Sequence, residues 1–260
     1  ATPDFMENPP LHNTEKTTLI ANPDNLGLAT AYNQGIELAR AREATHIILF
    51  DQDSVPANDM ISELLKVLSY HNSPHLRVAA AGPMYTDVKG QRSSPFVRLT
   101  GLRMKRIDCE HDQCVYVDHL ISSGSLIDLR AFEIVGKFTE TLFIDYVDTE
   151  WCWRARTKGL HLVGAGTAKM QHNLGDSHFK AFGKAIILHP PFRLYYQMRN
   201  QWWMILQPWV GWQWRIMDIL RSMKIFSAVM IFAPNRIERV RLMLRGILDG
   251  FRAKMGKLKD

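Results

Sequence analysis

The sequence has few cysteines and no long apolar run, and both absences restrict what the chain can be. Its three cysteines, Cys109, Cys114 and Cys152, form no CxxC pair, which argues against a structural zinc site or a disulfide framework and suits a reducing compartment. The longest uncharged apolar run, residues 225–234, is half of the roughly 20 residues that a membrane-spanning helix requires. Residues 1–10 are polar and rich in proline, so we expect no signal peptide.

Basic charge and tryptophan are concentrated toward the C-terminal end. The formal net charge is +6, yet residues 190–260 hold 13 Lys or Arg against four Asp or Glu, so the rest of the chain is slightly acidic. Five of the seven tryptophans lie between Trp202 and Trp214. This contrast predicts a main domain over residues 1–190 and a basic, Trp-rich, amphipathic helical region over residues 191–260. A nucleic-acid face and a merely solvated helical surface are the alternatives for the second region.

Alternating strand and helix patterns predict an α/β fold with a mostly parallel, Rossmann-like sheet flanked by helices. The compact apolar run at residues 46–50 is typical of a buried strand, and residues 160–170 form a second strand-like run. The polar, Arg-rich stretch at about residues 84–112 is interpreted as a loop or as small excursions from the sheet. Apolar residues at helical spacing and glycine end signals predict helices at residues 30–42, 60–70, 129–135 and 148–158.

Two aspartates directly follow the first buried strand, in the order Asp51, Gln52, Asp53. Ligands of open α/β sheets bind beyond the carboxyl ends of the strands. Carboxylates two residues apart on an extended chain project the same way and can share one hard cation. We therefore expect Asp51 and Asp53 to bind Mg²⁺ or Mn²⁺ together with phosphate oxygens. Acidic pairs after strands are also common without a metal, and the motif alone leaves that alternative open.

A second acidic cluster, Asp145, Asp148 and Glu150, lies at the start of a predicted helix beside three aromatic residues. A partly desolvated carboxylate there could act as a general base on an acceptor hydroxyl. The alternative is structural, since acids in a first helical turn cap the helix and favour its dipole. His172 follows another predicted strand, and a neutral imidazole could complete a metal site with the aspartates or be a hydrogen-bonded structural residue.

Polar turns supply weaker candidates for ligand binding. Asn25, Gly27 and Asn33 flank the start of the first predicted helix, where backbone amides can hold phosphate groups, although Asn-x-Gly also forms ordinary turns. Ser123 and Gly124 belong to a tight turn over residues 122–125.

Together, in this order, these segments resemble bacterial family-two glycosyltransferases of the GT-A type, and among them the rhamnosyltransferase group. The combined spacing of the motifs between Asn22 and Asn200 is far more specific than any one of them. The matching stretches are NPDNLGLATAYNQGIE, ILFDQDSVP, LISSGSLIDLRAFEIVGKF, FIDYVDTEWCWRARTKG, KMQHNLGD and PFRLYYQMRN.

The resemblance implies a role for each matching residue. Asp53 would be the principal metal ligand and His172 a further one, with Asp51 beside them near the donor's ribose and diphosphate. Asp148 would be the catalytic base, and Glu150 would hold the second acidic position of that motif. Two further groups of residues have implied positions. Asn25 and Asn33 would line the nucleotide pocket, and the turn with Ser123 and Gly124 would lie beside the donor sugar and the acceptor.

The resemblance also implies an inverting transfer of L-rhamnose from dTDP-rhamnose to a lipid-linked or polysaccharide acceptor, in synthesis of a cell-surface glycan such as O-antigen. The enzyme would lie peripherally on the cytoplasmic face of the inner membrane. Two strands that open the family pattern and hold the nucleotide base have no counterpart in the sequence, so we expect an N-terminally incomplete catalytic domain.

The basic region favours an anionic membrane as its partner, because apolar and basic residues alternate at helical spacing in residues 215–257. Packing of the apolar faces on the main domain or on a second copy of the chain, as a homodimer, is the alternative. Nucleic-acid binding through the basic region is a separate hypothesis, which we do not expect to hold. A degenerate interaction domain without catalysis is the remaining one.

Overall fold

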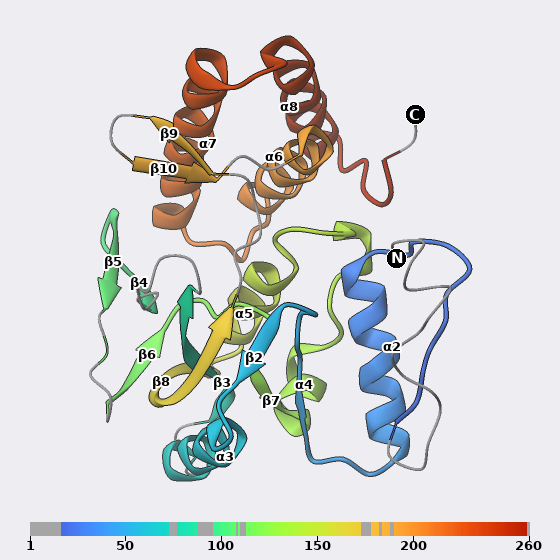
Figure 1. Ribbon diagram of the computed structural model, residues 1–260, viewed down its shortest axis with the longest axis vertical. Coiled ribbons are helices and arrows are strands. Elements are labelled where there is room, and N and C mark those ends of the chain that lie inside the picture. Colours follow the sequence, from blue (N-terminus) through green and yellow to red (C-terminus); the bar gives the residue numbers. More distant parts are fainter. Residues whose placement is uncertain are drawn as a thin grey trace.

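The computed structural model describes residues 17–72, 77–87, 96–107, 109, 113–172, 178–181, 184–187 and 190–258. Its centre is a six-stranded sheet in the order β1-β7-β3-β8-β2, with β6 pairing to β8 (Figure 1). The strands are β1 (His46–Ile48), β2 (Ser54–Pro56), β3 (Val78–Asp87), β6 (Cys114–Val117), β7 (Leu126–Asp128) and β8 (His161–His172). The helices around it are α2 (Leu28–Ala41), α3 (Met60–His71), α4 (Leu129–Val135) and α5 (Val147–Thr157).

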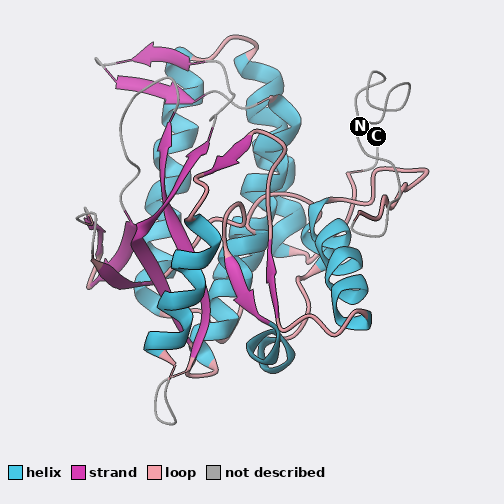
Figure 2. Ribbon diagram, turned by 60° about the horizontal axis from the view of Figure 1, so that its bottom comes forward, coloured by secondary structure: helices cyan, strands magenta, loops and turns pink. Residues whose placement is uncertain are grey.

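Helices cover both faces of the sheet. Neighbouring residues of a strand point to opposite faces, so each strand contributes side chains to two cores. Ile127 of β7 and Leu162 of β8 belong to a buried core with α2, α4 and α5. The adjacent residues, Leu126 and Val163, pack in a second core with α3. The α/β class predicted from the sequence is therefore confirmed, with the sheet between two helical layers (Figure 2).

The sheet is mixed, so the expectation of a mostly parallel sheet is corrected. β3 and β8 pair in parallel, whereas β7 runs antiparallel to both β1 and β3, and β2 and β6 run antiparallel to β8. The strands that follow a helix along the chain, β1, β3 and β8, share one direction. The strands that do not directly follow a helix, β2, β6 and β7, run the other way.

The stretch interpreted as a loop or small excursions contains a β-hairpin in its described part. Its strands are β4 (Phe96–Thr100) and β5 (Arg103–Ile107), joined by a turn in which Gly101 has a φ of 60°. β5 is almost entirely exposed, so it lacks the apolar alternation that marks a strand in sequence. A second small antiparallel pair follows the main sheet, β9 (His178–Ala181) with β10 (Lys184–Ile187).

The C-terminal region forms three helices that lie together at one end of the molecule (Figure 1). They are α6 (Pro191–Ile205), α7 (Trp212–Phe232) and α8 (Arg236–Phe251). Leu194 and Met198 of α6 pack with Val229 of α7 and Met243 of α8 in a buried cluster. Among the described helices, none combines the length and the apolarity needed to cross a bilayer.

Candidate active site

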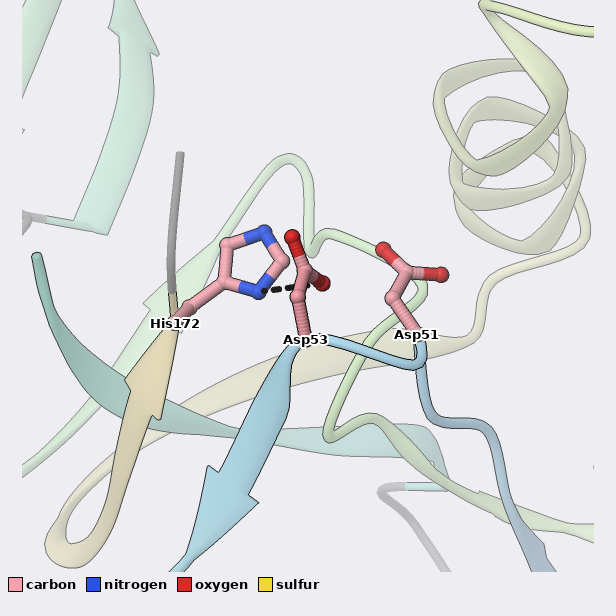
Figure 3. A group of neighbouring side chains, drawn as sticks. All are labelled: Asp51, Asp53 and His172. Atoms are coloured by element: carbon pink, nitrogen blue, oxygen red, sulfur yellow. Dashed lines mark ion pairs between the residues drawn. The ribbon is translucent and has the colours of Figure 1, made fainter. Parts of the chain in front are cut away.

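Asp51, Asp53 and His172 meet at the end of the sheet where β1 and β8 finish. β2 pairs with β8 so that Ser54 lies opposite His172, which brings the residue before Ser54 next to the imidazole. One potential ligand atom from each of the three side chains lies within 4.8 Å of the others. The imidazole faces the Asp53 carboxylate, with His172 Nδ1 3.5 Å from Asp53 Oδ1 (Figure 3).

A polar network beneath this cluster fixes its geometry. Ser54 Oγ forms hydrogen bonds with His172 Nδ1 at 2.7 Å and with Ser123 Oγ at 2.6 Å. Ser123 Oγ in turn accepts the backbone N–H of Asp51 at 3.1 Å, and the Tyr32 hydroxyl donates to Asp51 Oδ1 at 3.4 Å. No motif in the sequence predicts these roles for Ser54 and Tyr32, although Ser54 directly follows the acidic pair.

The chemistry of this cluster suits a divalent cation. Burial raises the pKa of Asp51 above its usual value, and the neighbouring Asp53 carboxylate adds to the increase, while the nearby His172 opposes it. A bound cation would favour the ionised form of Asp51 and offset this cost. Two carboxylates and one imidazole form a donor set suited to Mn²⁺, and carboxylates that keep positions open for phosphate oxygens suit Mg²⁺.

The cluster lies in a cleft of about 680 Å³ whose walls come from several elements. Asp145, Tyr146 and Asp148, from the segment that leads into α5, line the same cleft, as do Ser122 and Ser123. Arg193 also lines it, from the first turn of α6. The cleft therefore joins both acidic motifs of the sequence with a basic residue of the C-terminal region.

Asp148 is held as an ionised carboxylate. Its Oδ1 accepts the backbone N–H of Thr149 at 2.7 Å and its Oδ2 that of Ser122 at 3.3 Å, and His119 Nε2 lies 3.7 Å from Oδ1. Burial alone would raise the pKa of Asp148, but His119 and the two backbone donors outweigh it and lower the pKa below its usual value. A carboxylate that is ionised at neutral pH and faces a cleft can accept a proton from a bound hydroxyl group.

The two other acids of this motif have different surroundings. Asp145 lines the cleft, where Arg193 Nη2 donates to its Oδ1 at 2.8 Å. Glu150 is buried on the far side of α5, where Arg154 Nη2 donates to its Oε2 at 2.9 Å. Glu150 therefore lies away from the cleft, neutralised inside the fold by its i+4 arginine, and its expected catalytic role stays a prediction.

The residues of the predicted nucleotide-binding turns also differ in whether they line the cleft. Asn33 is buried, and its amide bonds to the backbone N–H and C=O of Phe138 and to Glu140, so it connects α2 to that loop and does not line the cleft. Asn25 Oδ1 accepts the N–H of Gly27 in a local turn, and neither residue lines the cleft. Gly124, with a φ of 80°, shapes the turn that presents Ser123. Of these five residues only Ser123 lines the cleft, as Asp51 does.

Comparisons with known proteins agree with this geometry. A sequence model described as glycosyl transferase family 2 matches residues 5–132. The dTDP-rhamnosyl transferase RfbF of Shigella flexneri is 34% identical over 248 residues, which cover 95% of this chain and 82% of that protein. The chain belongs to glycosyl transferase family 2. The expectation of a glycosyltransferase of the GT-A, α/β type is thereby confirmed.

Solved structures give more distant similarities. GalNAc-T7, crystallised with UDP, GalNAc and Mn²⁺, is 13% identical with a TM-score of 0.49, covering 89% of this glycosyltransferase and 44% of that chain. The protein A197 from STIV is also 13% identical, with a TM-score of 0.39, covering 62% of this chain and 76% of the other. The chain thus spans less than half of the GalNAc-T7 chain.

Proposed function

We propose that this glycosyltransferase transfers L-rhamnose from dTDP-rhamnose to a hydroxyl group of a glycan or lipid-linked acceptor, with inversion at the anomeric carbon. The proposal depends on one observation: the candidate metal-binding cluster of Asp51, Asp53 and His172 lines the same cleft as the ionised Asp148. The similarity to a protein named dTDP-rhamnosyl transferase supports the choice of donor.

In the proposed reaction, the acceptor oxygen forms a bond to the anomeric carbon while the bond from that carbon to the diphosphate oxygen breaks. Asp148 takes the proton of the acceptor hydroxyl, which its lowered pKa permits at neutral pH. Asp51, Asp53 and His172 would hold Mg²⁺ or Mn²⁺, which when bound neutralises charge on the leaving diphosphate. Ser122 and Ser123 line the cleft beside these groups.

The test measures dTDP release and rhamnosyl product from dTDP-rhamnose, with Asp148→Asn and Asp53→Ala as paired variants. Asp148→Asn keeps the size and cannot accept a proton, so we expect kcat to fall about 10²- to 10⁴-fold with donor affinity almost unchanged. Asp53→Ala should instead abolish metal-dependent donor binding, measured by calorimetry. Near-normal turnover by Asp148→Asn would assign the base to another residue, and unchanged metal dependence in Asp53→Ala would place the cation elsewhere.

We further propose that α8 rests on an anionic membrane at the cytoplasmic face, where a lipid-linked acceptor would be presented. A shallow groove on its outer side combines Ile237, Leu244 and Leu248 with arginines. Ile237 is 84% exposed, and each of the other two is about half exposed. Apolar side chains flanked by arginines match the interface of an anionic bilayer. The arginines of the groove are Arg241, Arg245 and Arg252.

The remaining faces of these helices have other partners. Val240 and Ile247 pack in the cluster shared with α6 and α7, so these apolar side chains are covered within the C-terminal region itself. Trp214 is buried against Tyr146 and Trp153, whereas Trp212 is 60% exposed. Trp214 therefore serves the contact between α7 and α5.

A further inference from the structure

The segment that carries the catalytic acids has a strained backbone. We name residues 143–148 the acid loop. Phe143, Asp145 and Tyr146 have φ values of 67°, 62° and 64°, a region that side chains other than glycine rarely adopt. Phe143, with a ψ of −65°, also centres a γ-turn of the rarer hand, closed by a 2.8 Å bond from Ile144 N–H to Leu142 C=O. Each such residue costs about 1–3 kcal/mol, so the surrounding structure must hold the loop.

Asn200 of α6 makes the most extensive polar contact with this loop. Its side chain is fully buried, and Nδ2 donates to the carbonyl oxygens of Leu142, Ile144 and Asp145 at 2.9, 2.8 and 2.8 Å. These carbonyls belong to the γ-turn and to the first of the two left-handed residues before α5. The two hydrogens of one amide group are thus shared among three carbonyl oxygens, and they link the γ-turn to the left-handed residues that precede α5.

Arg199 orients this amide. Its Nε donates to Asn200 Oδ1 at 2.9 Å, so the oxygen is engaged and both hydrogens of Nδ2 are directed to the loop. Its Nη2 donates to Leu142 C=O at 2.8 Å, and its Nη1 donates to the carbonyl oxygen of Gly256. The guanidinium therefore ties the start of the loop, the Asn200 amide and the chain after α8 into one buried network.

We propose that Asn200, oriented by Arg199, is a positioning residue that holds the acid loop so that Asp145 and Asp148 face the cleft. Asp148 is the second residue of α5, which begins directly after the two left-handed residues, so relaxation of their φ angles would redirect its carboxylate. The C-terminal helices would then be part of the catalytic apparatus as well as a membrane contact. This inference rests on the proposed role of Asp148 as the base.

The test compares Asn200→Ala with Tyr195→Phe in the full chain. Tyr195→Phe also removes a tertiary hydrogen bond of α6, to Asp249 Oδ2 of α8, but leaves the loop contacts in place. We expect Asn200→Ala to lower kcat about 10- to 100-fold, because small misplacements of catalytic groups have effects of this size. The donor KM should stay within about threefold of wild type, since the metal cluster is untouched, and Tyr195→Phe should keep its kcat.

Hydrogen exchange measured by mass spectrometry gives a readout that needs no donor. Asn200→Ala should raise exchange in peptides over residues 139–150, whose amides bond within the loop, and leave α3 and β3 unchanged. If Asn200→Ala is too unstable, Arg199→Lys serves instead, because it keeps the charge but loses the geometry that orients Asn200; it should show the same changes with smaller amplitude.

The outcomes separate this inference from the proposed function. Faster loop exchange together with a selective loss of kcat would support it. Unchanged loop exchange, an unchanged kcat, or an equal loss of kcat in Tyr195→Phe would overturn it and leave Asn200 as a stabilising residue only. If the wild-type enzyme does not use dTDP-rhamnose, the proposed donor fails, while the exchange experiment still tests whether Asn200 holds the loop.

Discussion

Asp218 of α7 is a buried carboxyl group whose replacement should stabilise the protein in a pH-dependent way. It is 3% exposed, its Oδ1 accepts the Tyr146 hydroxyl at 3.2 Å, and its Oδ2 has no partner among the described residues. Burial raises its pKa from 3.8 to about 6, and the nearby Arg221 and Tyr146 reverse this only in part. Ionised Asp218 is therefore a cost to the fold.

The pKa shift fixes the sign and the size of the effect. At a pH between 3.8 and about 6, the Asp218 carboxyl has lost its proton in the unfolded chain but keeps it in the folded chain. The free energy of unfolding therefore falls as pH rises through this range and is constant above it. A shift of about two units corresponds to at most about 3 kcal/mol. In Asp218→Asn, which can still accept the Tyr146 hydroxyl, this cost is absent, and the melting temperature at neutral pH should rise by up to roughly 10 °C.

Thermal unfolding of wild type and Asp218→Asn across the acid and neutral range measures the prediction as a difference curve. The two proteins should converge near about pH 4 and separate by about pH 6.5. Asp128→Asn is a control of opposite sign: burial alone would raise the pKa of Asp128, but bonds from Arg130 outweigh it and lower the pKa, so this variant should lose stability at neutral pH. A constant difference between Asp218→Asn and wild type at every pH would refute the assigned cost.

Two further predictions concern the approach of α2 to the acid loop and the membrane face. Gly27→Ala should destabilise the fold by about 1–3 kcal/mol and lower kcat, because φ at Gly27 is +88° and a Cβ would lie 2.7 Å from Phe143 O. The control is Gly35→Ala within α2, whose Cβ would meet no atom within 4 Å and which should be neutral or stabilising by thermal unfolding. Equal behaviour of the two variants would contradict a close approach of α2 to the acid loop. The double variant Ile237→Ser with Leu244→Ser should sediment less with anionic vesicles at low salt than the wild type, whereas the control Leu65→Ser on α3 should not. If the double variant instead changes the oligomeric state in the absence of lipid, this face of α8 binds a second copy of the chain.

Local signals in the sequence were sufficient wherever neighbouring residues decide the conformation. The helix predicted at residues 129–135 is α4 with the same bounds, because Asp128 caps its start and Gly136, with a φ of 91°, ends it. The apolar run before Asp51 is β1, and the cluster expected from two aspartates and one histidine is present. Both results depend on short-range rules of backbone conformation and strand periodicity.

Residue type alone could not separate catalytic from structural polar groups. Glu150 and Asp148 are two residues apart and chemically alike, yet residues that lie two apart on a helix point in different directions, so only Asp148 faces the cleft. Asn33 and Asn200 are both buried asparagines, and their partners are separated from them by more than 50 residues. Such long-range partners leave no periodic mark in the sequence.

The division of the chain at residue 190 shows most directly what composition conceals. Charge and tryptophan content distinguish the C-terminal region, because its outer face carries arginines and exposed apolar residues. Its inner face carries Arg193, Asn200 and Asp218, which contact Asp145, the loop carbonyls and Tyr146. A region that completes the surroundings of Asp145 and the loop before α5 cannot be removed without exposing them. Its basic, exposed groove lies on α8, whereas its contacts beside the cleft come from α6 and α7.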